Sequence, residues 1–328
     1  MSTPLFKRDD PKLGTIITKG NAGNVCFLGF PYDEGVARNG GRVGTERGPD
    51  VLRRFIYNLG PVVNPELEIS LQEFSIGDSG NIQGLTLEEA HQELQQQVET
   101  ILQDPSQPNL FVIGGGKDQG WPDSKGFLTY CHANSFIPVI INIDSHLDVR
   151  NLDDEGRIHS GCAFRILLDD PAFAELGGKF IEFGSQGSQC AQSHVDYVNS
   201  KGGRIIWLSS IRRKVIAPQS SIRGSLTQAG QVLEELLGEF DEKHRVFISF
   251  EVDAINSAFC PGVSCPSVDG GFTAEEAIEV GFVSGKNRKV TLMDMSEYNP
   301  AIEDYRTGRL LANIFYYFCL GVKIRTEN

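Results

Sequence analysis

The sequence has no excess of positive charge. Its 30 lysines and arginines are outnumbered by 43 aspartates and glutamates, which gives a formal net charge of -13. Nucleic acids and anionic membranes bind proteins through cationic surfaces, so this balance argues against both as partners. The chain also lacks an apolar run of membrane-spanning length and an apolar N-terminal stretch after a basic region. We therefore expect a cytoplasmic protein.

Cysteine patterns typical of zinc fingers or disulfide frameworks are missing. The 7 cysteines include no pair at zinc-finger spacing, and their number is odd. This cysteine usage is typical of proteins in a cytoplasmic compartment, where thiols stay reduced. Cys260 and Cys265 lie in a loop after an acidic strand described below. Two interpretations of this pair stay open: a redox role, or packing within the loop.

A nucleotide-binding fingerprint is absent as well. Residues 33–44 are rich in glycine, but they have neither the Lys-Ser/Thr ending of a phosphate loop nor G-x-G-x-x-G spacing. The glycines could still let backbone amides approach an anion.

Short apolar runs alternate with longer helical patterns along most of the chain. Apolar runs are found at residues 24–31, 111–113, 139–141, 204–208, 246–253 and 289–293, and helical patterns at 48–55, 86–102, 124–133, 228–240 and 305–320. This alternation predicts an α/β fold with a mostly parallel sheet and helices on both faces. Because no linker or internal repeat is visible, we expect a single domain over residues 1–328, with an irregular N-terminal arm at residues 1–22.

Two of the predicted strands end in acidic residues. The run at 139–141 leads to Asp144, His146 and Asp148, which strand alternation would place on one face. The run at 246–253 likewise ends with Glu251 and Asp253. Carboxylates and an imidazole suit Mn²⁺ or Mg²⁺ better than a thiolate-preferring metal. A solvated strand end is the alternative for the first group taken alone. Because ligands bind at the carboxyl ends of parallel strands, the two groups should meet in one cleft.

The spacing of these residues resembles a known family. Asp144-Ser145-His146-Leu147-Asp148 is similar to the D-A-H-x-D motif of the ureohydrolases, which comprise arginases, agmatinases and formiminoglutamases. Residues 249–253 resemble the S-x-D-x-D motif of this family, residues 114–117 stand where G-G-x-H belongs, and residues 293–300 resemble a motif ending in E-x-N-P. The resemblance covers about residues 24–320. It implies a three-layer arginase-like fold and a homo-oligomer, either a trimer or a dimer of trimers.

The same resemblance implies two Mn²⁺ ions with a bridging hydroxide that attacks the substrate. Asp144, His146, Asp148 and Asp253 keep the residue types of the family's ligands. Glu251 stands in place of an aspartate, which shifts its carboxylate by roughly 1.5 Å, about one C–C bond. Lys117 stands in place of a histidine.

The lysine is the serious departure, because an ammonium group has no lone pair for a metal. We therefore expect one well-formed site, made by Asp144, His146, Glu251 and Asp253, and a doubtful second site. Alternatively, the charge of Lys117 could itself fill the second position and bridge Asp144 and Asp148.

Within the family, residues 33–36, 39–42, 148–150, 159–165 and 184–187 resemble formiminoglutamases. This implies that N-formimino-L-glutamate is hydrolysed to glutamate and formamide. Arg150 or Arg165 would bind the extra carboxylate of such a substrate, since a guanidinium binds a carboxylate in a bidentate manner. An ion pair within the protein is the alternative for both arginines.

The resemblance also implies roles for other residues. Asp148 would take part in catalysis, Ser160 would contact the substrate, and Glu297 would hold the cationic nitrogen of the substrate and so act in both binding and catalysis. His159 is a candidate proton shuttle because its ordinary pKa is near neutrality.

Several functions remain open on the sequence alone. The first is a metal-dependent hydrolase of a formimino compound, with agmatine or arginine as the runner-up substrate. The second is a metal-poor, catalytically silent protein that binds a small molecule or regulates a partner, and the third is a structural role. The metal content of the purified protein distinguishes the first two.

Overall fold

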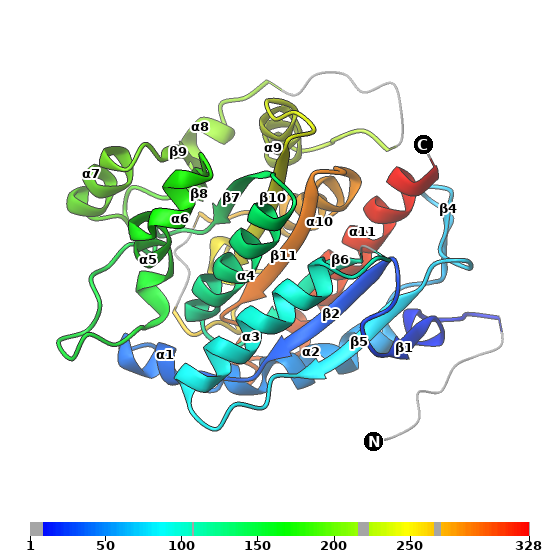
Figure 1. Cartoon of the computed structure of the whole chain (residues 1–328). Helices are drawn as coiled ribbons and strands as arrows, with labels where there is room; N and C mark the ends of the chain where they lie inside the picture. The colour runs from blue at the N-terminus through cyan, green and yellow to red at the C-terminus, as the bar shows by residue number, and fades with distance from the viewer. Residues whose placement is uncertain (1–8, 107, 216–222, 266–269, 328) are drawn as a thin grey trace.

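The computed structural model describes residues 9–106, 108–215, 223–265 and 270–327. Its central feature is a nine-stranded sheet in the order β1-β5-β2-β6-β11-β10-β7-β8-β9, in which all neighbouring strands run parallel. Two short strands, β3 and β4, form a separate antiparallel pair. The predicted α/β fold with a parallel sheet is confirmed (Figure 1).

The strands have the following bounds: β1 Ile17–Lys19, β2 Val25–Phe30, β3 Val63–Asn64, β4 Ile69–Ser70, β5 Ile76–Asn81, β6 Asn109–Gly114, β7 Ile137–Ile143, β8 Lys179–Ser185, β9 Arg204–Trp207, β10 His244–Glu251 and β11 Val290–Ser296. The helices have the following bounds: α1 Glu34–Arg38, α2 Gly48–Asn58, α3 Leu87–Leu102, α4 Gly120–Ala133, α5 Ala163–Asp169, α6 Pro171–Glu175, α7 Gln192–Ser200, α8 Leu208–Ile211, α9 Gln228–Gly238, α10 Ala274–Lys286 and α11 Tyr305–Glu327.

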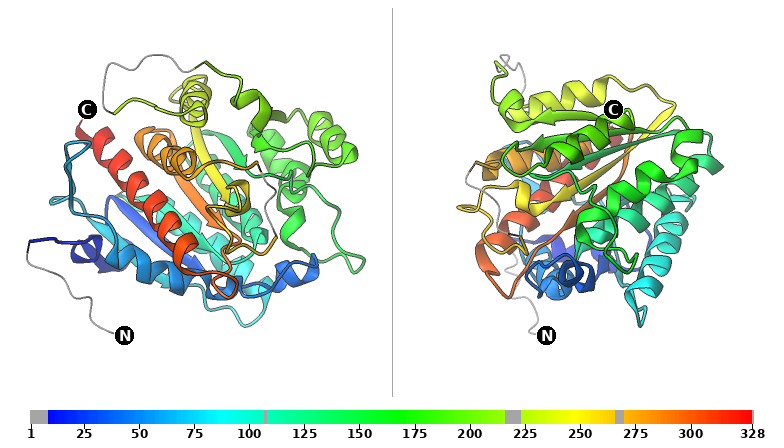
Figure 2. Two further views of the ribbon diagram at one scale, coloured as in Figure 1. Left: turned by 180° about the vertical axis from the view of Figure 1, so that it is seen from behind. Right: turned by 90° about the vertical axis from the view of Figure 1, so that its left-hand side faces the viewer.

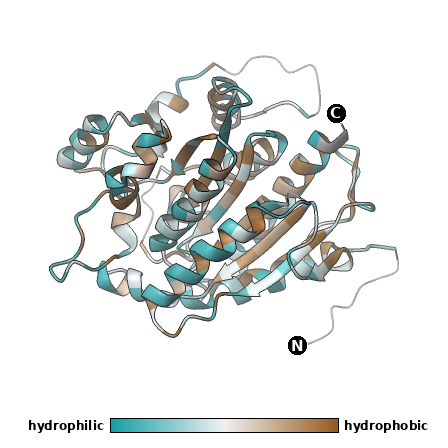
Figure 3. Ribbon diagram, viewed as in Figure 1, coloured by the Kyte–Doolittle hydropathy of each residue, from teal (hydrophilic) through white to brown (hydrophobic). Residues whose placement is uncertain are grey.

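Helices cover both faces of the sheet. Side chains that alternate along β6 enter two different cores: Phe111 and Ile113 pack in the core beneath α2, α9, α10 and α11, whereas Leu110 and Val112 pack in the core beneath α3, α4 and α5. Figures 1 and 2 show these two layers from the front and from behind. The central strands are coloured mainly as hydrophobic, while the helices that cover them show many hydrophilic segments (Figure 3). The layered arrangement follows from the period-two burial of fully covered strands.

The two acidic strand ends differ from the expectation in detail. Strand β7 ends at Ile143, so strand alternation does not bring Asp144, His146 and Asp148 together. Asp148 has φ +47°, in the left-handed region, and the chain turns there. Strand β10 ends at Glu251, and Asp253 lies in a 3-10 turn, Val252–Ala254. The residues are brought together by turns beyond the strands.

The predicted irregular arm is corrected in its second half. Residues Ile17–Lys19 form β1 and pair with β5 at one edge of the sheet, while residues 1–8 lie outside the described part of the chain. Within that part, none of the helices combines the length and the apolar character that a membrane crossing requires.

Candidate metal centre

Four potential metal ligands lie together at the carboxyl ends of β7 and β10, which are neighbours in the sheet. The ligand atoms of Asp144, His146, Glu251 and Asp253 are all within 4.8 Å of one another. The three carboxylates are buried and the imidazole is partly exposed. These are the residues that the sequence predicts for the well-formed site.

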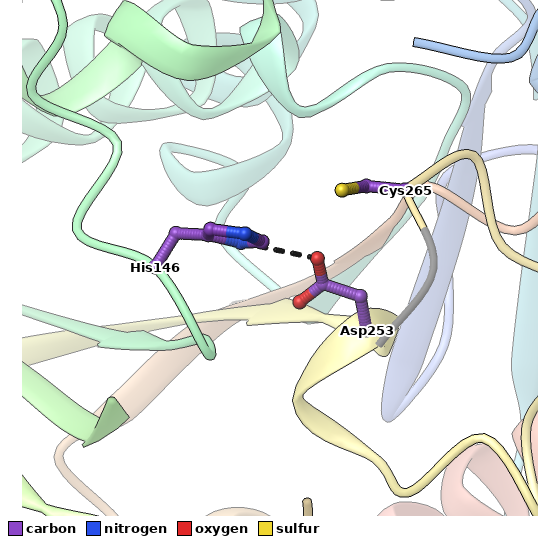
Figure 4. A group of neighbouring side chains, drawn as sticks. All are labelled: His146, Asp253 and Cys265. Carbon is purple, nitrogen blue, oxygen red and sulfur yellow. Dashed lines mark ion pairs between the residues drawn. The ribbon is translucent and has the colours of Figure 1, made fainter. Parts of the chain in front are cut away.

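Short contacts hold the group in place. His146 Nδ1 lies 3.1 Å from Asp253 Oδ2 and 3.3 Å from Asp144 Oδ1, and Figure 4 shows the imidazole pointing toward the Asp253 carboxylate. The His146 backbone N–H donates to Asp144 Oδ1 at 2.7 Å, and the Ser145 hydroxyl donates to Asp253 Oδ1 at 3.0 Å. No hydrogen bond reaches Asp253 Oδ2 from the described residues. Its one printed contact is the ion pair with His146 Nδ1, which a metal ion bound between the two groups would replace.

The electrostatics of the group call for a cation. Burial raises the pKa of Glu251 well above its usual range, and the charges of Asp144 and Asp253 raise it further. Burial opposes a charge on His146, yet Asp253 and Asp144 raise the pKa of its imidazole. Several buried carboxylates cannot all stay ionised without a positive partner. The carboxylate oxygens and the imidazole nitrogen of this group fit one Mn²⁺ or a similar ion.

Asp148 lies next to this group and is not one of the four. It is 8% exposed, and its Oδ2 accepts no hydrogen bond from the described residues. Burial and the charge of Asp144 raise its pKa. Asp148 was predicted both as a ligand and as a catalytic residue, and its open oxygen is compatible with either role.

Lys117 occupies the predicted position beside the cluster, in the 3-10 turn Lys117–Gln119 after β6. Its side chain is 1% exposed, and its ammonium group donates to Ser249 Oγ at 3.0 Å and lies 5.3 Å from the centre of the Phe164 ring. Burial would lower the pKa of Lys117, but the charges of Asp294 and Glu251 outweigh burial and raise it. The lysine therefore stays charged and cannot act as a ligand.

The idea that Lys117 bridges Asp144 and Asp148 is corrected by this geometry. Both carboxylates contribute to the field at the ammonium, but its hydrogen bond goes to Ser249. Ser249 Oγ in turn donates to Asp294 Oδ1 at 2.9 Å. The lysine is thus directed toward the sheet interior, where Asp294 is the first carboxylate to balance its charge.

A second buried carboxyl lies behind Asp294. Burial and the neighbouring charge of Asp294 raise the pKa of Asp123 well above its usual range. The backbone N–H of Phe250 donates to Asp294 Oδ1 at 3.0 Å. Sequence analysis did not single out Asp123 or Asp294. Asp294 could have been found, because it lies in the 293–300 motif. In the sheet it is the β11 residue paired with Ser249 of β10.

A cavity of about 220 Å³ opens onto the metal centre. His146, Asp148, Glu251 and Glu297 line its inner part, and Arg150, Ser160, His194 and Cys265 are also among its lining residues. Ser160 is buried, and its hydroxyl accepts a hydrogen bond of 3.0 Å from the Asn39 side chain. The glycine-rich loop contributes Asn39, Gly40 and Gly41 to the wall.

Arg150 and Glu297 present free polar atoms to this cavity. The Arg150 side chain is exposed, with no hydrogen bond or ion pair to any described residue, while its backbone N–H donates to Gly161 O at 2.8 Å. Glu297 has φ +72° and is 2% exposed. Its Oε1 accepts from the Lys117 backbone N–H, and its Oε2 accepts nothing from the described residues. Non-glycine residues in the left-handed region are costly and cluster at functional sites.

Two predicted site residues are placed elsewhere. His159 is not among the cavity-lining residues: its Nε2 contacts Asn151 O at 2.8 Å, and its Nδ1 accepts from the Gly161 N–H at 3.1 Å. Both ring nitrogens are engaged by these contacts within its own loop, and the role of His159 as a proton shuttle stays a prediction. Arg165 lines a different cavity, donates to Val149 O at 3.2 Å and lies over the Tyr197 ring. In this arrangement Arg165 supports the Val149 backbone, and its contact with the substrate stays a prediction.

The structure adds residues that the sequence did not indicate. His194 on α7 lines the cavity, and burial together with Arg150 and Arg165 lowers the pKa of its imidazole. Glu182 on β8 accepts from Asn142 at 2.9 Å, and Asn142 also donates to Asp144 at 3.4 Å. Neither residue belongs to a recognisable motif.

Cys265 differs from its neighbour Cys260. Its sulfur lies within 4.8 Å of ligand atoms of His146 and Asp253 (Figure 4). Cys260 is fully buried, and burial raises the pKa of its thiol. The structure therefore distinguishes the two members of the pair, with Cys265 alone beside the metal centre.

Comparison with known proteins adds an independent line of evidence. The formiminoglutamase of Trypanosoma cruzi, solved with Mn²⁺, is 40% identical in sequence and superposes with a TM-score of 0.86 over 97% of this chain and 100% of that one. Formimidoylglutamases of Staphylococcus aureus and Aliivibrio fischeri are 28% and 24% identical over 90% and 92% of this chain, and over 85% and 87% of their own lengths.

The structural match confirms the predicted three-layer arginase-like fold, and the chain is homologous to formiminoglutamases. Residues 23–321 match the sequence profile of the Arginase family. The metal-ligand group at the carboxyl ends of the strands, the nine-stranded sheet and this match agree, and the chain belongs to the Arginase family.

Proposed function

We propose that this protein hydrolyses N-formimino-L-glutamate to glutamate and formamide with the help of one divalent ion, preferably Mn²⁺. The observation that carries the proposal is a single cavity that joins the four-ligand group to the unpaired Arg150 guanidinium and to the free Glu297 Oε2. The named formiminoglutamase relatives support the choice of substrate.

Asp144, His146, Glu251 and Asp253 would hold the ion. When bound, the ion supplies a Lewis acid that lowers the pKa of water and polarises the substrate. The open Oδ2 of Asp148 would accept a proton from the attacking water. Lys117 contributes a fixed positive charge beside the carboxylates, which lowers the charge that the single ion must balance.

The rest of the cavity would bind the substrate. Glu297 Oε2 would accept a hydrogen bond from the formimino nitrogen, with its other oxygen fixed by the Lys117 N–H. The planar fork of Arg150 would bind a carboxylate of the glutamate part. An agmatine-like substrate has no carboxylate for this arginine, which favours the formimino compound.

The buried Lys117 favours a second candidate function, a catalytically silent protein that binds a small molecule without metal. In this alternative the lysine removes the need for an ion by neutralising the carboxylates permanently. Both candidates share the cavity and the Arg150 contact, but they differ in metal content.

Elemental analysis of the purified protein, followed by turnover assays, tests the proposal. We expect about one Mn²⁺ per chain after incubation with the metal, and turnover of N-formimino-L-glutamate that EDTA abolishes. Metal-free protein that still binds the compound would select the silent alternative. Faster turnover of arginine or agmatine would overturn the choice of substrate. We also expect a homo-oligomer, and a monomer mass in light scattering would contradict this.

A further inference from the structure

A second cavity, of about 570 Å³, lies at the amino ends of the strands, whereas the metal centre lies at their carboxyl ends. It is lined at the amino ends of the four central strands by Asn109 of β6, Phe136 just before β7, Arg245 of β10 and Thr291 of β11. Arg288 and Arg325 complete its charged wall. We call this feature the arginine cavity. It shares no residue with the cavity at the metal centre.

None of the three arginines has a carboxylate partner among the described residues. Arg325 donates to Val290 O at 2.9 Å and also to Asn287 O. Arg288 donates to the backbone oxygen of Arg325 at 2.8 Å, and Arg245 donates to His244 O at 2.8 Å. Carbonyl oxygens orient a guanidinium, but they do not cancel its charge.

Three arginines gather at this cavity although the chain has a net charge of -13. Other arginines of the protein form ion pairs with carboxylates, among them Arg38, Arg53, Arg157, Arg204 and Arg212. In the arginine cavity, burial and the charge of Arg288 together lower the pKa of Arg325 to about 10. The mutual repulsion is therefore not relieved by the protein itself.

The wall of the cavity also contains an unsatisfied polar group. The Thr291 hydroxyl is buried and has no hydrogen-bond partner among the described residues. Buried polar groups normally have a partner, and water or a ligand bound in the cavity would supply one here. Asp104, which also lines the cavity, has its Oδ1 engaged by the Ser106 hydroxyl and backbone N–H.

We propose that the arginine cavity binds a compact polyanion that carries two or three carboxylate or phosphate groups. The guanidinium of Arg245 lies 3.7 Å from the centre of the Phe136 ring, which holds its planar fork in one orientation. Bidentate contacts from such forks suit carboxylates and phosphates equally. The volume is within the range of small-molecule sites, about 300–1,000 Å³.

Isothermal titration calorimetry with citrate and with pyrophosphate tests the proposal on the full chain. We expect at least one of the two to bind, and the better binder shows whether carboxylates or phosphates are preferred. Arg288→Gln removes an exposed fork, and Thr291→Val removes only the hydroxyl of a β-branched residue that can remain in the strand. Each change should weaken binding by about tenfold, as the loss of a hydrogen bond to a charged group implies.

Arg213→Gln is the matched control, because it removes the same charge from an exposed position outside both cavities. It should leave the affinity unchanged, and circular dichroism and metal content should be the same for all variants. Absence of binding by both anions, or equal weakening in the Arg213 variant, would overturn the proposal. Self-association of the protein that Arg288→Gln abolishes, without anion binding, would instead identify the cavity as an interface between copies of this chain.

Discussion

The backbone of Lys117 holds the side chain of Glu297: the Lys117 N–H donates to Glu297 Oε1 at 2.7 Å. The Lys117 side chain points to a different partner, since its ammonium group donates to Ser249. The two functions of this position are thus separate. A change of the Lys117 side chain can alter the metal centre while the anchor of Glu297 is kept.

This separation makes Lys117→His an informative variant. We expect Mn²⁺ occupancy to rise from about one to about two ions per chain, because imidazole supplies a lone pair and a fixed positive charge is removed. Elemental analysis after dialysis measures the change. Lys117→Met is the control: it removes the charge without adding a ligand and should not create a second site. An unchanged occupancy in Lys117→His would show that this position does not face the ion.

Arg150 and Arg165 form a natural pair for testing substrate recognition. Arg150→Ala should reduce kcat/KM for N-formimino-L-glutamate by about 10²-fold, since a charge-assisted contact in a partly desolvated cavity is worth roughly 2–3 kcal/mol. Metal content should not change. Arg165→Ala should instead lower the melting temperature, because Arg165 contacts Tyr197 and Val149 O. If Arg150→Ala lost metal and kept the substrate preference, Arg150 would be a partner of the acids and not of the substrate.

Cys265 should be visible in the spectrum of the cobalt-substituted protein. Its sulfur lies within 4.8 Å of ligand atoms of His146 and Asp253, and a thiol that coordinates a metal is deprotonated. We expect visible d–d bands from bound Co²⁺ together with a near-ultraviolet thiolate charge-transfer band. Cys265→Ser should remove only the charge-transfer band. Cys190→Ser, which changes another partly buried cysteine, should leave both features intact. Bands without any thiolate contribution in the unmodified protein would exclude Cys265 as a ligand.

His194 should make stability depend on pH. Burial, Arg150 and Arg165 lower its pKa in the folded protein, so the unfolded chain binds this proton more readily. The stabilising contribution is complete above the ordinary histidine pKa of about 6.5 and is lost as the pH falls through the lowered value. Urea unfolding of the metal-free protein measures this change in the free energy of unfolding, at one pH above about 6.5 and at several acidic pH values. His194→Gln should show a smaller loss of unfolding free energy at acid pH, and an identical loss would contradict the assignment.

The sheet and the ligand types could be predicted from the sequence, but the loops of the site could not. Short buried runs such as Val139–Ile141, bounded by polar residues and rich in β-branched side chains, identify a central strand. The grouping of Asp144 and His146 was predicted correctly from the wrong premise, since a turn and not strand alternation brings them together. The left-handed conformation of Asp148 leaves no mark in the sequence, because an aspartate occurs in either backbone region.

Residues that are neighbours in one motif do not all line the same cavity. His159 and Arg165 belong to the same stretch as Ser160, yet only Ser160 reaches the cavity. Helix α5 directs Arg165 toward Tyr197. The 3-10 turn engages Nδ1 of His159, and Asn151 O contacts its Nε2. His194 could not be predicted, because a lone histidine on a polar helix resembles any surface residue.

Strand β11 begins at the arginine cavity with Thr291 and ends beside the metal centre, where Glu297 follows Ser296. Six residues of strand separate the two openings by about 20 Å, at roughly 3.3 Å per residue. An anion neutralised by its three arginines would therefore exert almost no field on the carboxylates. Its effect would be mechanical, as a clamp on the amino ends of the strands, and it would raise resistance to unfolding while leaving the chemistry at the far edge unaltered.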